Sequence, residues 1–154
     1  MLTTACAAVR ANGARALVTS GDVDPKSLPT GEDVVAVRSA SHEAVLREAR
    51  ALITHCGMGT VHRALVAGVP LLCQPIGRDQ PDVAARVRAT GAGLRTSPNA
   101  APRRVARALA RLLVDPRYAA RAADVGARLA AAAATERYVT ELEELVEPAR
   151  STVE

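Results

Sequence analysis

The sequence predicts an α/β fold, with a parallel sheet that carries helices on both faces. Short apolar runs alternate with amphipathic segments through residue 95, as expected for successive strands and helices. The apolar runs lack the every-second-residue alternation of strands with one wet face, which indicates strands covered on both sides. With 49% hydrophobic residues, 1% aromatic residues and no Phe or Trp, the core has to be aliphatic. These features are typical of a Rossmann-like domain.

Five strands follow from the apolar runs and from the polar turns that end them. Gly13 can end a first helix in the left-handed conformation, and the segment SGDVDPKSLPTG after residue 19 has to be a turn. The expected strands lie at residues 14–19, 34–37, 51–54, 69–74 and 92–95. The helices around them are expected at residues 2–12, 43–50, 60–66 and 81–89.

From residue 101 onward the chain shows only helical patterns, and Asp115-Pro116 separates the first of them from the second. Helices are expected at residues 101–113, 116–134 and 136–146. We expect a single domain over residues 1–154, with residues 101–150 as its C-terminal helices. Packing into the core is the favoured role for the apolar side of the last helix, and docking on a partner is the alternative. That side consists of Val139, Leu142, Leu145 and Val146.

Composition narrows the class of partner. The net charge of +4 comes from scattered arginines, which favours an anionic small molecule over nucleic acid, and the scarcity of aromatic side chains argues against base stacking. Three cysteines without a C-x-x-C pair argue against zinc or a disulfide framework and favour a reducing, cytoplasmic compartment. No apolar run reaches the roughly 20 residues of a membrane span, so no membrane partner is expected.

The chemistry concentrates in residues 51–80. There an apolar strand ends at His55, and Gly57 and Gly59 loosen the backbone before a helix begins at Thr60. A turn of this kind leaves the first N–H groups of the helix unpaired at the positive end of its dipole. An anion such as a phosphate is therefore the expected ligand.

A second polar turn, at residues 75–80, follows the next strand. Because the carboxyl ends of parallel strands meet at one edge of a sheet, both turns should lie together. Plain structural roles are also open: His55 could bond a backbone carbonyl, and Asp79 could cap the following helix. Cys56 and Cys73 are expected to be small buried residues rather than nucleophiles.

The order of these motifs resembles the donor-binding half of family 1 glycosyltransferases. These are GT-B enzymes, and they include bacterial macrolide and antibiotic glycosyltransferases and plant UDP-glycosyltransferases. The resemblance covers roughly residues 2–146, and its segments read HCGMGT (55–60), ALVAGVP (64–70) and PIGRDQPDVAARV (75–87). It implies that one turn holds the diphosphate of a nucleotide-sugar and that the other holds sugar hydroxyls. The implied diphosphate ligands are His55, Gly57, Gly59 and Thr60, and the implied sugar ligands are Asp79 and Gln80.

The donor implied by the resemblance is a UDP- or TDP-sugar, with no other cofactor and no metal. In such a site the helix dipole and the histidine offset the charge of the leaving group. Asp22-Val23-Asp24 has the D-x-D form that chelates a cation in the other glycosyltransferase fold. Since it precedes Pro25 in a turn, an ordinary turn is the favoured interpretation.

Three positions depart from the family. Arg63 stands where a glutamate usually accepts hydrogen bonds from the ribose, and an arginine can only donate. Ser39 and His42 stand where a base-stacking Trp and a nearby Gln are usual, so the platform for the base is missing. If these residues contact ribose or base, we expect weaker UDP binding or a shift toward another nucleotide.

The resemblance also implies that two parts of such enzymes, a first strand and an acceptor-binding domain, are expected to be missing from residues 1–154. Relatives place a strand ahead of the first helix, at the centre of the sheet. Without it, the strands at residues 14–19 and 51–54 either pair directly or keep unpaired edges, which predicts low stability or self-association. The acceptor-binding domain carries the general base in such enzymes, so no catalytic residue is assigned here.

The implied function is that of the donor half of a glycosyltransferase. Such an enzyme transfers a hexose to a hydroxyl of a small-molecule acceptor, with inversion and without a metal. Whether this chain is itself an enzyme stays open. The alternatives are a non-catalytic donor-binding module that acts with a separate acceptor-domain subunit, and a degenerate module that binds nothing.

Overall fold

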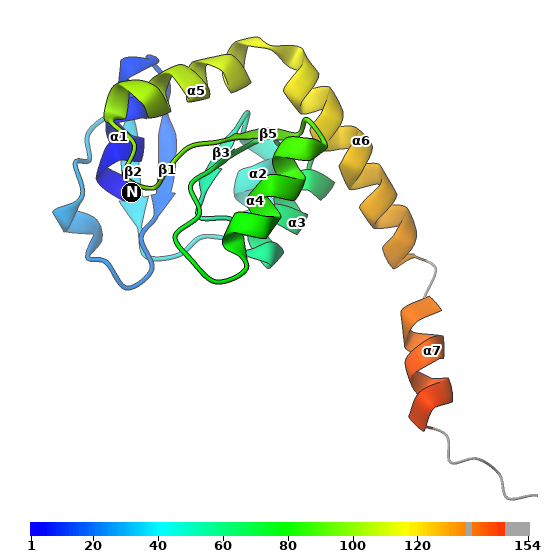
Figure 1. Ribbon diagram of the computed structural model, residues 1–154. Coiled ribbons are helices and arrows are strands. Elements are labelled where there is room, and N and C mark those ends of the chain that lie inside the picture. Colours follow the sequence, from blue (N-terminus) through cyan, green and yellow to red (C-terminus); the bar gives the residue numbers. More distant parts are fainter. Residues whose placement is uncertain (135–136, 147–154) are drawn as a thin grey trace, which may run out of the picture.

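The computed structural model describes residues 1–134 and 137–146, and in these residues five strands alternate with helices (Figure 1). The strands are β1 (Ala16–Thr19), β2 (Val34–Val37), β3 (Leu52–Thr54), β4 (Leu71–Cys73) and β5 (Gly93–Arg95). The helices are α1 (Leu2–Ala11), α2 (His42–Glu48), α3 (Met58–Val66), α4 (Gln80–Ala89), α5 (Pro102–Val114), α6 (Pro116–Ala133) and α7 (Arg137–Val146). A short 3-10 turn, η1 (Pro25–Ser27), lies between β1 and β2.

Every expected strand and helix is present, and all except β2 have shifted ends. The helix α2 begins one residue early because Ser41 caps it, with its Oγ accepting from the Ala44 N–H at 3.3 Å, and it ends before the extended Ala49. Most strands are shorter than their apolar runs, and β4 covers residues 71–73 of the expected 69–74. Gly13 takes the predicted left-handed conformation after α1, with φ of 58°. Residue 136, where the last helix was expected to begin, and residues 147–150 lie outside the described residues.

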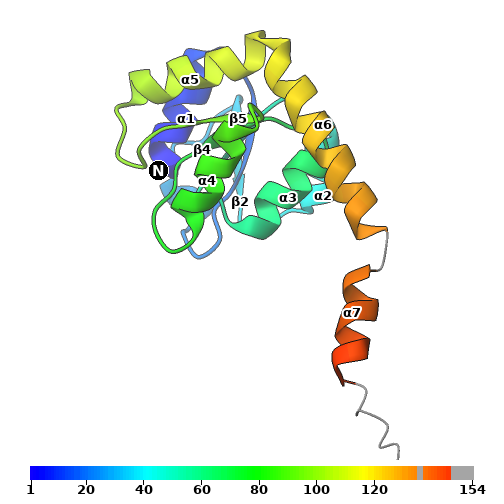
Figure 2. The ribbon, with the colours of Figure 1, turned by 45° about the vertical axis from the view of Figure 1, so that its right-hand side comes forward.

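Helices cover both faces of the strands and divide the core into two clusters (Figures 1 and 2). One cluster joins α1 and α5 with Val34 of β2 and Leu72 of β4. The other joins α2, α3 and α4 with Leu71 and Cys73 of β4. Successive residues of β4 enter different clusters, and all three are fully buried. The predicted α/β fold with helices on both faces of parallel strands is confirmed.

The strands form two parallel sheets rather than one. One sheet pairs β1 with β2, and the other has the order β3-β4-β5. Within residues 1–134 and 137–146, β1 and β3 do not pair directly, and each keeps one unpaired edge, which is the second of the two expected arrangements. Both sheets still share one helical layer, because Val18 of β1 and Ile53 of β3 pack against the cluster that α1 and α5 build.

Helix α6 packs on α3 through Gly126. A Cβ at this position would lie 2.0 Å from the carbonyl oxygen of Leu65 and 2.9 Å from the Cα of Val66. Only a residue without a Cβ allows the two helix backbones to come so close. The contact holds α3, and with it the glycine turn from which α3 starts.

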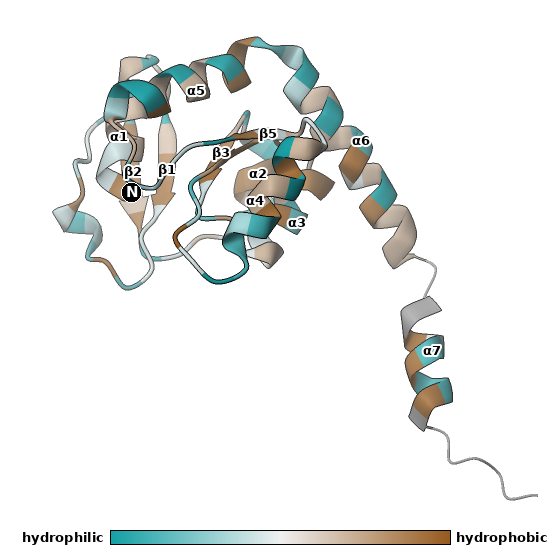
Figure 3. Cartoon of the chain, in the orientation of Figure 1, coloured by the Kyte–Doolittle hydropathy of each residue, from teal (hydrophilic) through white to brown (hydrophobic). Residues whose placement is uncertain are grey.

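Helix α7 leaves its apolar side uncovered. Figure 1 shows it beyond α6 and away from the sheets, and Figure 3 shows hydrophobic and hydrophilic residues on its surface. Val139, Leu142 and Leu145 are 56%, 62% and 81% exposed. The expectation of core packing is wrong for these three residues, because nothing in the described chain folds over them. The side chain of Val146 lies outside the described part of the structure.

We expect Gly126→Ala to lower the free energy of unfolding by about 1–3 kcal/mol, because the added methyl group forces α6 away from α3. Helix propensity alone would predict the opposite, a more stable variant, since alanine is a better helix former than glycine. Urea denaturation of both proteins measures the difference. Gly77→Ala is the matched control, because a Cβ there meets nothing within 4 Å. A stabilised Gly126→Ala variant would contradict the close packing of α3 and α6.

Candidate functional site

Buried local contacts set the turn that follows β3. Cys56 takes a left-handed backbone conformation with φ of 73°, and Gly57 caps α3 in an extended conformation. Cys56 is fully buried, and its N–H donates to Oγ1 of Thr54 at 3.2 Å. A left-handed non-glycine residue persists only where its surroundings hold it. The buried Cys56 therefore anchors the turn and leaves His55 on the outside.

Helix α3 begins at Met58, two residues earlier than predicted. The carbonyl oxygen of Gly57 accepts from the N–H groups of Thr60 and Val61, both at 3.0 Å. Among the described residues, the N–H groups of Met58 and Gly59 have no backbone partner. The helix offers these two donors to a ligand, and Thr60 can offer only its hydroxyl. The helix starts earlier than the sequence predicts because Gly59 lies inside its first turn.

The imidazole of His55 lies over the start of α3. A Cβ at Gly57 would be 3.0 Å from Nε2 of His55, so the exposed ring lies close above the backbone of Gly57. A Cβ at Gly59 would meet only Nη1 of Arg63, at 3.7 Å. Packing therefore does not require a glycine at position 59. Without a Cβ there, a ligand can approach the backbone at the start of α3. In the described chain the ring of His55 bonds no backbone carbonyl, so its plain structural role finds no support.

The second turn, after β4, is braced by Gln80. Its side-chain oxygen accepts from the N–H groups of Ile76 and Gly77, at 2.8 and 3.1 Å, and only its amide nitrogen remains to donate to a ligand. Arg78 takes a left-handed conformation with φ of 57°. Asp79 occupies the N-cap position of α4, but its carboxylate makes no capping hydrogen bond. The side chain of Asp79 therefore does not cap α4, and its carboxylate is available to a ligand.

The two turns meet at one edge because β3 and β4 are parallel neighbours. The pairing continues to the ends of both strands, where the Gln74 N–H donates to the Thr54 carbonyl oxygen at 2.8 Å. His55 and the turn at residues 75–80 thus leave the sheet side by side. Ser39, which is exposed, and His42, which is half-buried, follow β2 in the other sheet, so no strand pairing brings them to His55.

Each turn also carries an exposed apolar side chain that the sequence analysis did not single out. Met58, the first residue of α3, is 56% exposed, and Ile76 is 66% exposed. An isolated large apolar residue inside a polar turn was the available signal. These side chains place apolar surface beside the polar groups, a combination typical of small-molecule sites.

The two cysteines nearest the site, Cys56 and Cys73, are fully buried, as expected for small buried residues. The hydrogen bond between their sulfurs lowers the pKa of the Cys56 thiol and, together with burial, raises the pKa of the Cys73 thiol. Because neither side chain is exposed, neither is placed to attack a ligand.

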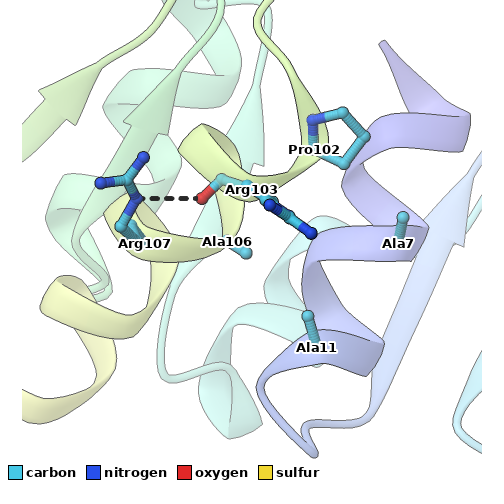
Figure 4. Close-up of a pocket in the computed structure, with 6 residues that line it drawn as sticks. All are labelled: Ala7, Ala11, Pro102, Arg103, Ala106 and Arg107. Atoms are coloured by element: carbon cyan, nitrogen blue, oxygen red, sulfur yellow. Dashed lines mark hydrogen bonds between the residues drawn. The ribbon is translucent and has the colours of Figure 1, made fainter.

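The structure gives no other motif a site. Asp24 caps η1, with its carboxylate accepting from the Lys26 N–H at 3.1 Å, so the D-x-D segment forms an ordinary turn. Within residues 1–134 and 137–146, no three His, Cys, Asp or Glu side chains gather to hold a metal ion, and no helix is long and apolar enough to cross a membrane. A hollow of about 470 Å³ between α1 and α5 contains none of the predicted site residues (Figure 4). It is lined by Ala7, Ala11, Pro102, Arg103, Ala106 and Arg107.

Known proteins with similar sequences are glycosyltransferases. An uncharacterized glycosyltransferase of Mycobacterium tuberculosis is 34% identical over 149 residues, which is 97% of this chain and 34% of the relative. The vancomycin aglycone glucosyltransferase of Amycolatopsis orientalis is 36% identical over 87 residues, which is 56% of this chain and 21% of that enzyme. The chain thus spans about a third of the length of the mycobacterial relative.

Solved structures with this fold are GT-B glycosyltransferases. The glycotransferase of kitacinnamycin matches with a TM-score of 0.80 and 28% identity, over 94% of this chain and 39% of that one. The glycosyltransferase VinC, solved in complex with DTDP, matches with a TM-score of 0.76 and 29% identity, over 85% of this chain and 34% of that one. Residues 4–145 match the family described as Erythromycin biosynthesis protein CIII-like, C-terminal domain. The chain therefore belongs to this family of glycosyltransferase C-terminal domains.

Proposed function

We propose that the chain binds the diphosphate of a nucleotide-sugar at the start of α3, as the donor half of a glycosyltransferase. The observation that carries this proposal is the pair of unpartnered N–H groups on Met58 and Gly59 below the ring of His55. These donors stand at the positive end of the helix dipole, where a phosphate is stabilised. The hydroxyl of Thr60 adds a third polar contact. Family membership supports a nucleotide diphosphate as the anion.

The donor sugar belongs, in this proposal, at the turn after β4. The carboxylate of Asp79 can accept from two sugar hydroxyls, and the amide nitrogen of Gln80 can donate to a third. Because Gln80 keeps its oxygen on the N–H groups of Ile76 and Gly77, its amide is held in one orientation. A fixed amide group orients the sugar without losing further side-chain freedom on binding.

Arg63 points to the kind of nucleotide. Its guanidinium lies beside Gly59, so it can donate to the diphosphate but cannot accept a hydrogen bond from ribose. UDP carries a 2′-hydroxyl that would stay without an acceptor there, and TDP has none. We infer a preference for TDP-sugars. Ser39 and His42 offer no aromatic face, so the base gains little from stacking in this proposal.

The reaction proposed for the complete enzyme is transfer of a hexose to a hydroxyl of a small-molecule acceptor, with inversion. The dipole of α3 and His55 would offset the charge on the departing diphosphate, so no metal is assigned. The general base would come from an acceptor-binding domain of the complete enzyme. In this proposal residues 1–154 act as one donor-binding domain.

A second candidate is a non-catalytic donor-binding module that acts only with an acceptor-domain subunit. The exposed apolar side of α7 favours it, because Val139, Leu142 and Leu145 form a surface that an apolar partner could cover. Turnover of a TDP-sugar by the chain alone would exclude this candidate. Turnover only after an acceptor domain is added would support it.

We expect TDP to bind the chain and His55→Ala to weaken that binding about tenfold, the usual cost of one hydrogen bond to a charged group. Isothermal titration calorimetry measures both dissociation constants. His62→Ala is the matched control, because His62 is an exposed histidine of α3, the helix that follows His55. Equal affinity of wild type and His55→Ala would remove His55 from the diphosphate site.

We expect Arg63→Glu to raise the affinity for UDP relative to TDP by about fivefold, because the new carboxylate accepts a hydrogen bond from the 2′-hydroxyl that only UDP carries. The ratio of the two affinities is the measured quantity, since the lost positive charge weakens both ligands. Arg86→Glu makes the same charge change on an exposed residue of α4 and should leave the ratio unchanged. An unchanged ratio in Arg63→Glu would place Arg63 away from the ribose.

We expect Asp79→Asn to weaken binding of TDP-glucose about fivefold while leaving TDP itself unaffected, because the carboxylate contacts only the sugar in this proposal. Titration of both ligands into both proteins tests this. Equal losses for TDP and TDP-glucose would show a disturbed turn instead of a sugar contact.

A further inference from the structure

The hollow between α1 and α5 is walled by small apolar side chains. Ala7 and Ala11 line it from α1, and Pro102 and Ala106 line it from α5 (Figure 4). Ala7 and Ala11 are exposed, whereas the contact of α1 with the core is made by buried neighbours such as Val9. The two alanines therefore leave a space beside the packed core. Its volume of about 470 Å³ lies within the roughly 300–1,000 Å³ of small-molecule sites.

The walls of the hollow favour an apolar occupant. Methyl groups and a proline ring offer no hydrogen bond, so a polar group placed against them would lose its bonds to water without replacement. An aliphatic chain has no such bonds to lose, and it gains free energy with every methylene group that leaves water. The hollow is therefore suited to a hydrocarbon chain.

The side chain of Asn12 holds the hollow in shape. Its Nδ2 donates to the carbonyl oxygen of Ala8 on α1 at 2.8 Å and to that of Ala106 on α5 at 3.1 Å. This link ties the end of α1 to the wall that α5 provides. A hollow that is already formed costs a ligand little free energy of ordering.

Two arginines add positive charge to the hollow. Arg103 and Arg107 both line it, and Figure 4 shows the side chain of Arg103 reaching from α5 toward α1. Nε of Arg107 donates to the carbonyl oxygen of Arg103 at 3.5 Å, which leaves its terminal nitrogens free. Neither guanidinium takes part in the ion pairs found in the described residues. An unpaired guanidinium binds a phosphate or a carboxylate through parallel N–H groups.

The helical layer around the hollow holds the net positive charge of the chain. Residues 1–16 and 96–114, which include α1 and α5, contain six arginines and no Asp or Glu. The other residues contain 14 Lys and Arg against 16 Asp and Glu. The arginines are thus scattered along the sequence but gathered in one layer of the fold. A surface of one sign attracts anions to the hollow.

We propose that the hollow between α1 and α5 binds an anionic amphiphile, with an aliphatic chain between the helices and a phosphate or carboxylate head group on Arg103 and Arg107. Each half of this ligand answers one half of the site, because the walls are apolar and the arginines are unpaired. The ligand is either a free amphiphile or a lipid of an anionic membrane. The site shares no residue with the proposed nucleotide-sugar site.

Octyl phosphate tests the proposal, at concentrations below those at which it forms micelles. We expect saturable binding to one site in isothermal titration calorimetry. From butyl to octyl phosphate the affinity should rise about twofold for each added methylene, since every methylene group removes more apolar surface from water. Inorganic phosphate and octanol, which each carry only half of the ligand, should bind at least tenfold more weakly than octyl phosphate.

Two variants locate the binding place. We expect Arg103→Gln to weaken the binding of octyl phosphate about tenfold, the usual cost of a hydrogen bond to a charged group. Arg104→Gln is the matched control, because Arg104 is an exposed arginine of α5 that does not line the hollow. Ala7→Leu should weaken binding at least as much, because the larger side chain fills the hollow without changing the charge.

Ala120→Leu makes the same change as Ala7→Leu at an exposed position of α6 and should bind octyl phosphate as wild type. His55→Ala should also bind it as wild type, so failure of this proposal and failure of the proposed diphosphate site give different results. Circular dichroism checks that each variant is folded.

Sedimentation with phosphatidylglycerol vesicles identifies the source of the amphiphile. Binding of the chain to these vesicles that both Arg103→Gln and Ala7→Leu weaken would assign a membrane lipid. Binding of octyl phosphate without binding of vesicles would assign a free amphiphile.

Three results would overturn the proposal. They are absence of saturable binding of octyl phosphate, equal affinity for octyl phosphate and inorganic phosphate, and equal affinity of wild type and Ala7→Leu for octyl phosphate. The second would show that charge alone attracts the anion, and the third would place the chain of the amphiphile outside the hollow.

Discussion

The pairing of β3 with β4 is the interaction on which the candidate site depends. It continues to the last residues of both strands, through the bond from Gln74 to Thr54, and so releases the two functional turns side by side. Local contacts then hold each turn: the buried Cys56 lies below the first, and the side-chain oxygen of Gln80 bridges the second. These contacts position the exposed residues His55 and Asp79.

The contacts that a Cβ would make distinguish glycines needed for packing from glycines that only a ligand would need. Gly126 is required by the packing of α6 on α3, because a Cβ there would lie 2.0 Å from a backbone oxygen, whereas a Cβ at Gly57 would be 3.0 Å from the exposed ring of His55. Gly59 has no such contact, so its bare backbone matters only if a ligand lies on it. Loss of function at Gly59 without loss of stability would therefore carry more information about the site than the same loss at Gly57.

The sequence was sufficient for the layer structure and for the edge that holds the site, because apolar runs and glycine turns are local signals. It placed β2 correctly, and it placed the turns at the carboxyl ends of neighbouring strands. It failed where the outcome depends on individual contacts that apolar patterns do not encode. The brace from Gln80 to Ile76 and the early start of α3 at Met58 are set by local hydrogen bonds, and Leu142 is exposed because no described residue covers it.

The interrupted sheet and the candidate site meet at β3. One edge of this strand pairs with β4, and the other leaves Ile53 open two residues before His55. A strand held by one edge opens more readily than one held by two, so part of the free energy of binding any ligand goes into ordering it.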